Sequence, residues 1–320
     1  MKSVRVRVTD DLELHAIVPK ENDHATARGQ TPVLCLPSAF GSVIHNFRPQ
    51  FDALSDEFKF VGVDPRGYGF SRPPTRDFPD AYFERDADDV VRAMDALGYD
   101  KVSSWNQPVG GGTLIMTRML TTIPNISNSF RSWDGAQAPI RALCWLPRIR
   151  TVSSGSCSST AMTLLGKKTS DVCYVAQAFV DVEDLDIYTE YEAIAKWHPA
   201  SRVEGESIYG AERLQEGWSQ MLTKLRSIYE KAHGDLYCDK LPQIRCKTLV
   251  VAGAQDRLVP DFHSEYLSER IMHCRLHVFP RGRHDVHLHD AAAFNDLLRT
   301  FLTEEDDKQT QSREYVARPM

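Results

Sequence analysis

The chain has 320 residues, of which 42% are hydrophobic and 26% are charged, a composition typical of ordinary globular proteins. This composition excludes a fibrous, collagen-like or wholly disordered chain. The formal net charge is −6 and no basic stripe is long enough to follow a phosphate backbone, so we expect no nucleic-acid partner. No run approaches the roughly 18 apolar residues that a membrane span needs, so we expect no membrane partner.

The first residues and the cysteines bear on the cellular compartment. The opening sequence, MKSVRVRVTD, has neither the apolar core of a signal peptide nor the Arg- and Ser-rich pattern of a presequence. We expect an intracellular protein, cytoplasmic rather than mitochondrial. The seven cysteines contain no C-x-x-C pair, which argues against both a disulfide framework and a zinc ribbon.

Apolar runs and alternating patterns divide the chain into strands and helices. Strands are predicted at 4–8, 12–18, 33–36, 58–63, 101–105, 248–253 and 275–279. Helices are predicted at 45–54, 81–97, 183–197, 211–232 and from Asp290 to 303, with Asp290 as cap. In this last helix the apolar side chains fall on one face, namely Phe294, Leu297, Leu298, Phe301 and Leu302.

The alternation of strand and helix predicts the α/β class, with a mostly parallel sheet covered by helices on both faces. Residues 1–303 should form a single domain. The helices between the strands at 101–105 and 248–253 predict a helical cap over about 181–240. The polar tail, 304–320, is expected to be disordered.

Two polar residues follow consecutive strands in the second half of the chain. Asp256 comes just after the strand at 248–253, and His284 follows the next strand, 28 residues later. In open α/β sheets ligands bind at the carboxyl ends of the strands, so both side chains should face one site. An acid followed by a histidine in this order is used by α/β-hydrolases, where the carboxylate orients the imidazole that takes the nucleophile's proton.

Less specific interpretations of these residues exist. Asp256 could cap the helix after Pro260, and His284 could be a surface residue; the joint placement favours a catalytic pair. A metal site at His284, His287 and His289 is disfavoured because their spacing is not H-E-x-x-H and no carboxylate cluster accompanies them. We therefore expect no metal and no other cofactor.

Several motifs closely resemble the valacyclovir hydrolase, or biphenyl hydrolase-like, branch of the α/β-hydrolase family. They are Asp64-Pro65-Arg66-Gly67-Tyr68-Gly69 with Ser71-Arg72-Pro73-Pro74, Phe83-Glu84-Arg85-Asp86-Ala87, Asp256-Arg257-Leu258-Val259-Pro260, and Gly282-Arg283-His284 with His287-Leu288. The resemblance covers about residues 1–105 and 172–303. It implies the α/β-hydrolase fold and a serine hydrolase acting on esters or related small acyl compounds, without a cofactor.

The resemblance also implies roles for single residues. His284 would be the base, Asp256 the orienting acid, and the N–H of Ala39, which follows the strand at 33–36, one donor of the oxyanion hole. Asp64 leads into a Gly-rich turn whose glycines permit backbone angles that other residues resist. We expect a small-molecule acyl substrate and a monomeric protein.

The family's nucleophile motif, G-x-S-x-G on the turn after the strand at 101–105, does not occur in this chain. Laying the branch pattern without gaps from Val102 places Pro108 in the nucleophile slot, so the nucleophile is unassigned. The next slot is Val109, where the branch often has an Asp suited to an amino group on the substrate. A preference for amino-acid esters is therefore not implied.

The region around this slot differs in composition from the rest of the chain. From Gly110 to Ser170 there is one acidic residue, Asp134, against seven Lys or Arg, where the average would give about eight acids. The branch pattern resumes at Val172, later than the family spacing would place it. We hypothesise that part of 106–171 is not ancestral hydrolase sequence, as a translated intron or a shifted frame would produce.

Three alternatives remain open. Ser104, Ser132 and Cys157 are rival nucleophiles, although none has the flanking glycines that the motif requires. A catalytically inactive member could keep the pocket and bind small acyl molecules or a protein partner. Loss of the elbow and of the helix behind it could also leave the chain unable to fold well.

Overall fold

The computed structural model describes residues 1–20, 32–80, 82–99, 103–106, 113–118, 177–244 and 247–304. Predictions that concern Pro108, Val109, Ser132, Cys157 and the tail from 305 lie outside these residues. Most of the unusual segment 106–171 lies outside them as well.

The described residues form one sheet of eight strands, ordered β1-β2-β4-β3-β5-β6-β7-β8. The strands are β1 Lys2–Thr9, β2 Leu12–Val18, β3 Val33–Leu36, β4 Phe60–Val63, β5 Ser103–Asn106, β6 Thr113–Arg118, β7 Lys247–Gly253 and β8 Cys274–Phe279. Seven of these coincide within two residues with strands predicted from the sequence. Strands β2, β3, β4 and β7 carry apolar runs that are almost wholly buried, whereas β1 shows the alternation of a strand at the edge of the sheet. Strand β6 was not predicted, since it lies in the segment set aside as unusual.

The sheet is mixed, which corrects the expectation of a mostly parallel one. The pairs β3/β4, β3/β5 and β7/β8 are parallel, whereas β1/β2, β2/β4, β5/β6 and β6/β7 are antiparallel. Only residues 107–112 separate β5 from β6. A parallel crossover needs a dozen or more residues, so a strand that follows this closely pairs antiparallel.

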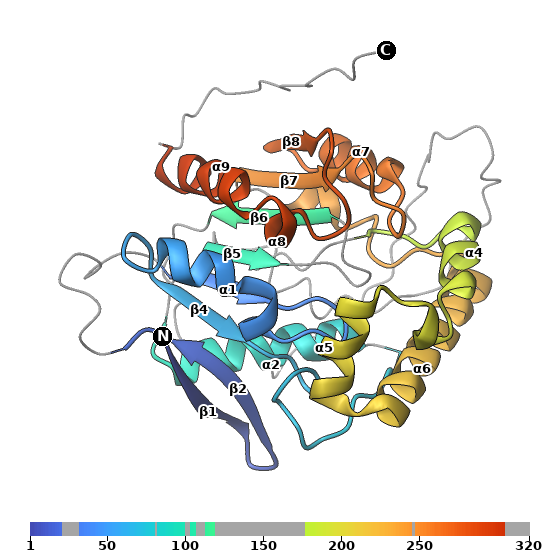
Figure 1. The fold of residues 1–320 in the computed structure, drawn as a ribbon, viewed down its shortest axis with the longest axis horizontal. Coiled ribbons are helices and arrows are strands. Elements are labelled where there is room, and N and C mark those ends of the chain that lie inside the picture. Colours follow the sequence, from blue (N-terminus) through green and yellow to red (C-terminus); the bar gives the residue numbers. More distant parts are fainter. Residues whose placement is uncertain are drawn as a thin grey trace, which may run out of the picture.

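Helices cover both faces of the sheet, as predicted (Figure 1). They are α1 Val43–Leu54, α2 Tyr82–Ala96, α7 Asp261–Arg270, α8 Val286–His289 and α9 Ala291–Thr303. Alternate residues of β7 show the two faces: Leu249 and Val251 pack with α1, α8 and α9, whereas Val250 packs with α7. Leu34 of β3 packs against α2 on the same face as Val250. The core is therefore two apolar layers, one on each side of the sheet.

Helix α9 buries the predicted face, with Phe294, Leu298 and Phe301 almost inaccessible. Its predicted cap is only partly correct. Asp290 occupies the position before α9, but its side chain makes no capping hydrogen bond. The same residue also ends α8, and its backbone angles of φ −113° and ψ 38° differ from the extended conformation of a capping residue.

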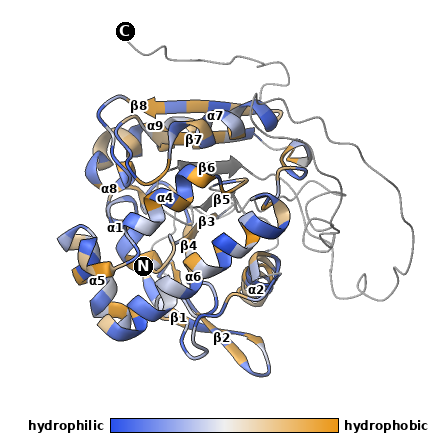
Figure 2. Cartoon of the chain, turned by 90° about the vertical axis from the view of Figure 1, so that its right-hand side faces the viewer, coloured by the Kyte–Doolittle hydropathy of each residue, from blue (hydrophilic) through white to orange (hydrophobic). Residues whose placement is uncertain are grey.

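The residues predicted as a cap form α4 Val182–Glu190, η2 Ile194–Lys196, α5 Pro199–Tyr209 and α6 Ala211–Ala232, followed by η3 Leu241–Gln243. Helix α5 was not predicted. These helices lie together beside the sheet at the right of Figure 1. Figure 2 shows that α6 mixes hydrophilic and hydrophobic residues, as expected for a helix with one buried face. None of the described helices is long and apolar enough to cross a membrane.

Helices α4, α5 and α6 share an apolar cluster with the loop after β3. Leu214, Trp218 and Leu222 of α6 are buried in the same cluster as Phe40. Gly217 allows this contact, because a Cβ atom there would lie 2.7 Å from the Phe40 ring. The helices therefore cover the turn that carries the predicted oxyanion donor.

Candidate active site

Asp256 lies in the loop between β7 and α7, and the backbone of this loop holds its carboxylate. Its Oδ1 accepts hydrogen bonds from the N–H groups of Leu258 at 2.8 Å and Val259 at 3.1 Å. The side chain is 5% exposed. Helix α7 begins after Pro260 without a side-chain cap. Asp256 therefore orders its own loop, and the alternative in which it caps the helix is wrong.

His284 follows β8 and lies against this acid. Its Nδ1 is 3.0 Å from Asp256 Oδ1 and 3.1 Å from Oδ2. Gly253 at the end of β7 permits the approach of the two loops, because a Cβ atom there would lie 2.5 Å from the carbonyl oxygens of Gly282 and Arg283. The two residues that the sequence placed after neighbouring strands are thus brought together.

The contacts of Asp256 determine which imidazole nitrogen of His284 can accept a proton. The ionised carboxylate only accepts hydrogen bonds, so the network assigns the ring hydrogen to Nδ1 and leaves Nε2 as an acceptor. The His284 side chain is 20% exposed, so the ring is not sealed in the core. Burial alone would lower the pKa of His284, but the charge and hydrogen bond of Asp256, with the charge of Asp285, raise it overall.

This raised pKa leads to a prediction about stability. A histidine whose pKa is higher in the folded than in the unfolded state contributes stability below its ordinary value of 6.5. That contribution disappears as the pH rises through the raised pKa. The difference in unfolding free energy between wild type and His284→Gln should therefore be largest near pH 5 and shrink toward about pH 9.

Urea denaturation of both proteins across this pH range measures the difference. His289→Gln is the matched control, because His289 is an exposed histidine on the neighbouring helix. A difference for His284→Gln that stayed constant, or grew with pH, would contradict the pairing with Asp256.

Ala39 lies in a tight turn after β3, in which the N–H of Gly41 donates to the carbonyl of Ser38 at 3.0 Å. Phe40 adopts the left-handed conformation with φ 58°, which is uncommon for a bulky residue. Its ring packs edge-on against Tyr68, Tyr209 and Trp218. Within the described part of the chain, the N–H of Ala39 has no hydrogen-bond acceptor.

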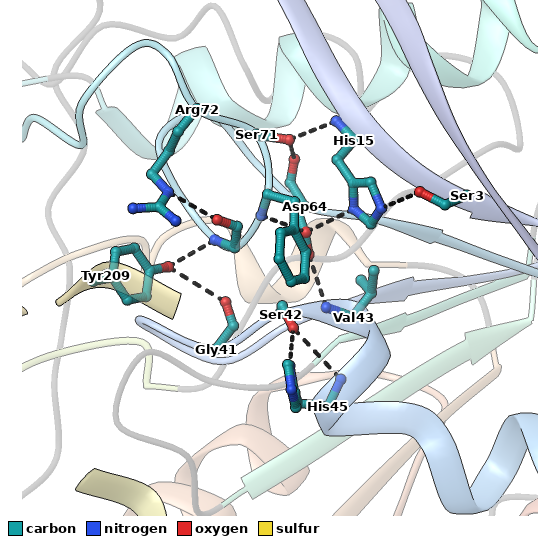
Figure 3. A network of polar contacts seen from close by, with 12 residues as sticks. Ser3, His15, Gly41, Ser42, Val43, His45, Asp64, Ser71, Arg72 and Tyr209 are labelled. Carbon is teal, nitrogen blue, oxygen red and sulfur yellow. Dashed lines mark hydrogen bonds and ion pairs between the residues drawn. The ribbon is translucent and has the colours of Figure 1, made fainter. Parts of the chain in front are cut away.

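Asp64 at the end of β4 connects this turn to the Gly-rich loop (Figure 3). Its Oδ1 accepts from the N–H of Val43 at 2.7 Å, and its Oδ2 accepts from the N–H of Phe70 at 2.9 Å. Gly69 has φ 48°, and a Cβ atom there would lie 2.3 Å from Asp64 Oδ2. The loop therefore needs Gly69 for its backbone angle, as predicted from the sequence, and also for the space that Asp64 occupies beside it.

Tyr209 at the end of α5 contacts both the turn after β3 and the Gly-rich loop. Its hydroxyl accepts from the N–H of Gly69 at 2.7 Å and donates to the carbonyl of Gly41 at 3.4 Å. Arg72 lies over the Tyr209 ring at 4.6 Å. Sequence reasoning missed Tyr209, because a single aromatic residue at the end of an unpredicted helix does not indicate a polar contact with two distant glycines.

A carboxyl group of helix α5 interacts electrostatically with the loop that carries His284. The pKa of Glu204 on α5 is raised, first by burial and then by the charge of Asp285, while His45 lowers it. Glu204 therefore interacts electrostatically with His45, at the start of α1, and with Asp285, the residue after His284.

The metal alternative has no support in this arrangement. His287 is buried, with its ring against Phe47 and Phe294, whereas His289 is exposed at the end of α8. Among the residues that the structure describes, no group of three His, Cys, Asp or Glu side chains could hold a metal ion.

The slot that the branch pattern gives to the nucleophile follows β5 in the sequence. Asn106 at the end of β5 pairs with Leu36 at the end of β3, so the ends of these two strands lie side by side. Pro108, Ser132 and Cys157 lie outside the described residues. Ser104 is inside β5, paired with Leu34, and not on the turn after it. This position does not match the exposed elbow that a nucleophile of this type requires.

Known proteins resemble this chain in both sequence and fold. Residues 31–115 match the model of the alpha/beta hydrolase fold family. Serine hydrolase BPHL of Mus musculus is 33% identical over 86% of this chain and 80% of its own length. Serine hydrolase BPHL of Homo sapiens is 31% identical over 94% of this chain and 86% of its own length.

A solved structure shows the same fold at lower identity. A hydrolase from Pseudomonas aeruginosa superimposes with a TM-score of 0.58, covering 94% of this chain and 98% of its own at 18% identity. With two relatives above 30% identity along most of their length, the chain belongs to the α/β-hydrolase fold family, and these relatives are serine hydrolases.

Proposed function

We propose that this chain hydrolyses carboxylic esters or related small acyl compounds, with His284 as the base and Asp256 as the acid that orients it. The observation that carries the proposal is the pair of hydrogen bonds from His284 Nδ1 to Asp256 at 3.0 and 3.1 Å. They leave Nε2 of a partly exposed ring ready to accept a proton.

The chemistry assigns a separate task to each residue. The nucleophile's proton passes to His284 Nε2, and the imidazolium that forms is stabilised by the charge of Asp256. The negative charge that develops on the substrate's carbonyl oxygen is stabilised by a hydrogen bond from the N–H of Ala39. The raised pKa of His284 means that the neutral base becomes available, and the rate should increase, as the pH rises through that pKa.

The residue that would supply the nucleophile is unassigned. Pro108 in the family's slot has no group that can attack a carbonyl carbon. This favours a second candidate function, an inactive member that binds small acyl molecules or a protein partner. The next strand, β6, also favours this second function. A nucleophile elbow leads from a strand into a helix, whereas the next described element after β5 is an antiparallel strand.

A fluorophosphonate probe separates the two candidates. An activated nucleophile should form a covalent adduct, located by peptide mapping, and His284→Ala should abolish that adduct together with hydrolysis of p-nitrophenyl acetate. Full esterase activity in His284→Ala would refute the base assignment. If wild type shows neither a His284-dependent adduct nor hydrolysis, the binding function takes its place. Sequencing the native transcript across codons 105–171 shows whether Pro108 is encoded as written.

A further inference from the structure

A Ser, a His and an Asp are linked near the β1 edge of the sheet, away from the His284 and Asp256 pair; they lie on β1, on β2 and just after β4. Ser3 Oγ lies 2.8 Å from His15 Nε2, and His15 Nδ1 lies 2.8 Å from Asp64 Oδ2 (Figure 3). Strand pairing sets this arrangement. Arg5 pairs with His15, so Ser3, two residues before Arg5, is a diagonal neighbour of His15 on the same face of the sheet. The N–H of Asp64 donates to the His15 carbonyl at 3.0 Å, which holds Asp64 beside His15.

The hydrogen bonds around Asp64 determine the direction of the chain of contacts. Both of its carboxylate oxygens accept backbone N–H groups, from Val43 and Phe70, so Asp64 acts as an acceptor. His15 Nδ1 must then donate to Asp64, and Nε2 is left to accept the hydroxyl hydrogen of Ser3. This is the order of donors and acceptors that activates a serine in a hydrolase triad.

The exposure of the three residues fits the same interpretation. Asp64 is inaccessible and His15 is 4% exposed, whereas Ser3 is exposed. Phe70 packs its ring edge-on against His15 at 5.2 Å and is itself 37% exposed, which places apolar surface beside the base. A reagent from solution can therefore reach the hydroxyl, while the imidazole is held in one orientation by buried contacts.

We propose that Ser3 is an activated nucleophile and a site of covalent modification by acyl or phosphonyl electrophiles. With a fluorophosphonate, Ser3 Oγ forms a bond to phosphorus, the P–F bond breaks, and fluoride leaves with the bonding electron pair. The hydroxyl proton passes to His15 Nε2, and the imidazolium is paired with Asp64. The site shares no residue with the His284 and Asp256 pair.

The test is a time course of fluorophosphonate labelling of the full chain, with chymotryptic peptides analysed by mass spectrometry. Ser207 is an internal reference, because it is also exposed but its hydroxyl donates to the carbonyl of Glu204 and not to a histidine. A positioned general base accelerates proton transfer by about 100-fold or more, so Ser3 should be labelled about 100-fold faster than Ser207. Equal rates at the two serines would overturn the proposal.

Two variants locate the cause of the acceleration. His15→Gln can still donate to Asp64 but cannot take a proton, so it should reduce the labelling of Ser3 to the rate at Ser207. His233→Gln, at an exposed histidine after α6, should leave it unchanged. Undiminished labelling in a His15→Gln protein that melts cooperatively would refute the role of His15. If that variant does not fold, the comparison within wild type still decides. Peptide mapping separates this result from any adduct that depends on His284.

Discussion

Replacing Asp256 by Asn should lower the rate constant for ester hydrolysis by about 10⁴-fold while the protein stays folded. The Asn oxygen can still accept the N–H groups of Leu258 and Val259, which keeps the loop in place. Its NH₂ group then faces His284 Nδ1 and donates to it. The ring hydrogen moves to Nε2, and the nitrogen that should accept the nucleophile's proton is blocked.

The measurement is kcat for a p-nitrophenyl ester, determined beside a thermal melting curve. Glu269→Gln, which removes one charge from the exposed end of the neighbouring helix α7, is the matched control and should keep full activity. A large loss confined to kcat would show that the orientation of His284 matters in the transition state. An Asp256→Asn enzyme as active as wild type would remove Asp256 from the mechanism.

Replacing Asp184 by Ala should lower the free energy of unfolding by about 2–4 kcal/mol, because it removes a buried carboxylate that accepts hydrogen bonds from His263 and Gln177. His263 Nε2 on α7 lies 2.8 and 2.9 Å from the two Asp184 oxygens on α4, and both side chains are fully buried. Asp184 also accepts the backbone N–H of Asp181 at 2.8 Å, which closes the capping box that begins α4.

Urea denaturation measures this effect, with Glu183→Ala as the control. Glu183 is the preceding residue in the same helical turn but is exposed, so its loss should change stability by no more than about 0.5 kcal/mol. The double variant Asp184→Ala, His263→Ala should lose less than the sum of the single losses, because the two residues act on each other. Additive losses would show that the pair is not coupled.

The features that could be predicted from sequence are those set by local patterns. The strands at 12–18 and 33–36 are observed at those bounds because their apolar runs end at turn-forming residues. The pairing of Asp256 with His284 followed from two neighbouring parallel strands whose carboxyl ends must share one edge. The strand bounds are set by a few neighbouring residues, and the meeting of the two side chains follows from the order of two adjacent parallel strands.

The features that were missed depend on contacts between distant residues. Helix α5 contains Pro199, two serines and Gly205, and its mixed composition gives little helical signal. It is held instead by Ile208 and Tyr209, which are buried in the cluster shared with α6 and Phe40. Strand β6 has an apolar run, but its place in the sheet depends on backbone pairing with β5 and β7, which no local pattern records.

The position of β6 in the sheet has a consequence for the site. Strands β7 and β8, which carry Asp256 and His284, join the rest of the sheet through β6, whereas Ala39 follows β3 on the other side of β5. The register of β6 against its neighbouring strands therefore fixes the position of His284 and Asp256 relative to Ala39. A slip by one residue would shift one half of the site along the other by about 3.3 Å, more than a hydrogen bond tolerates. Substitutions far from His284 that alter this register would separate base and oxyanion donor while leaving each of them intact.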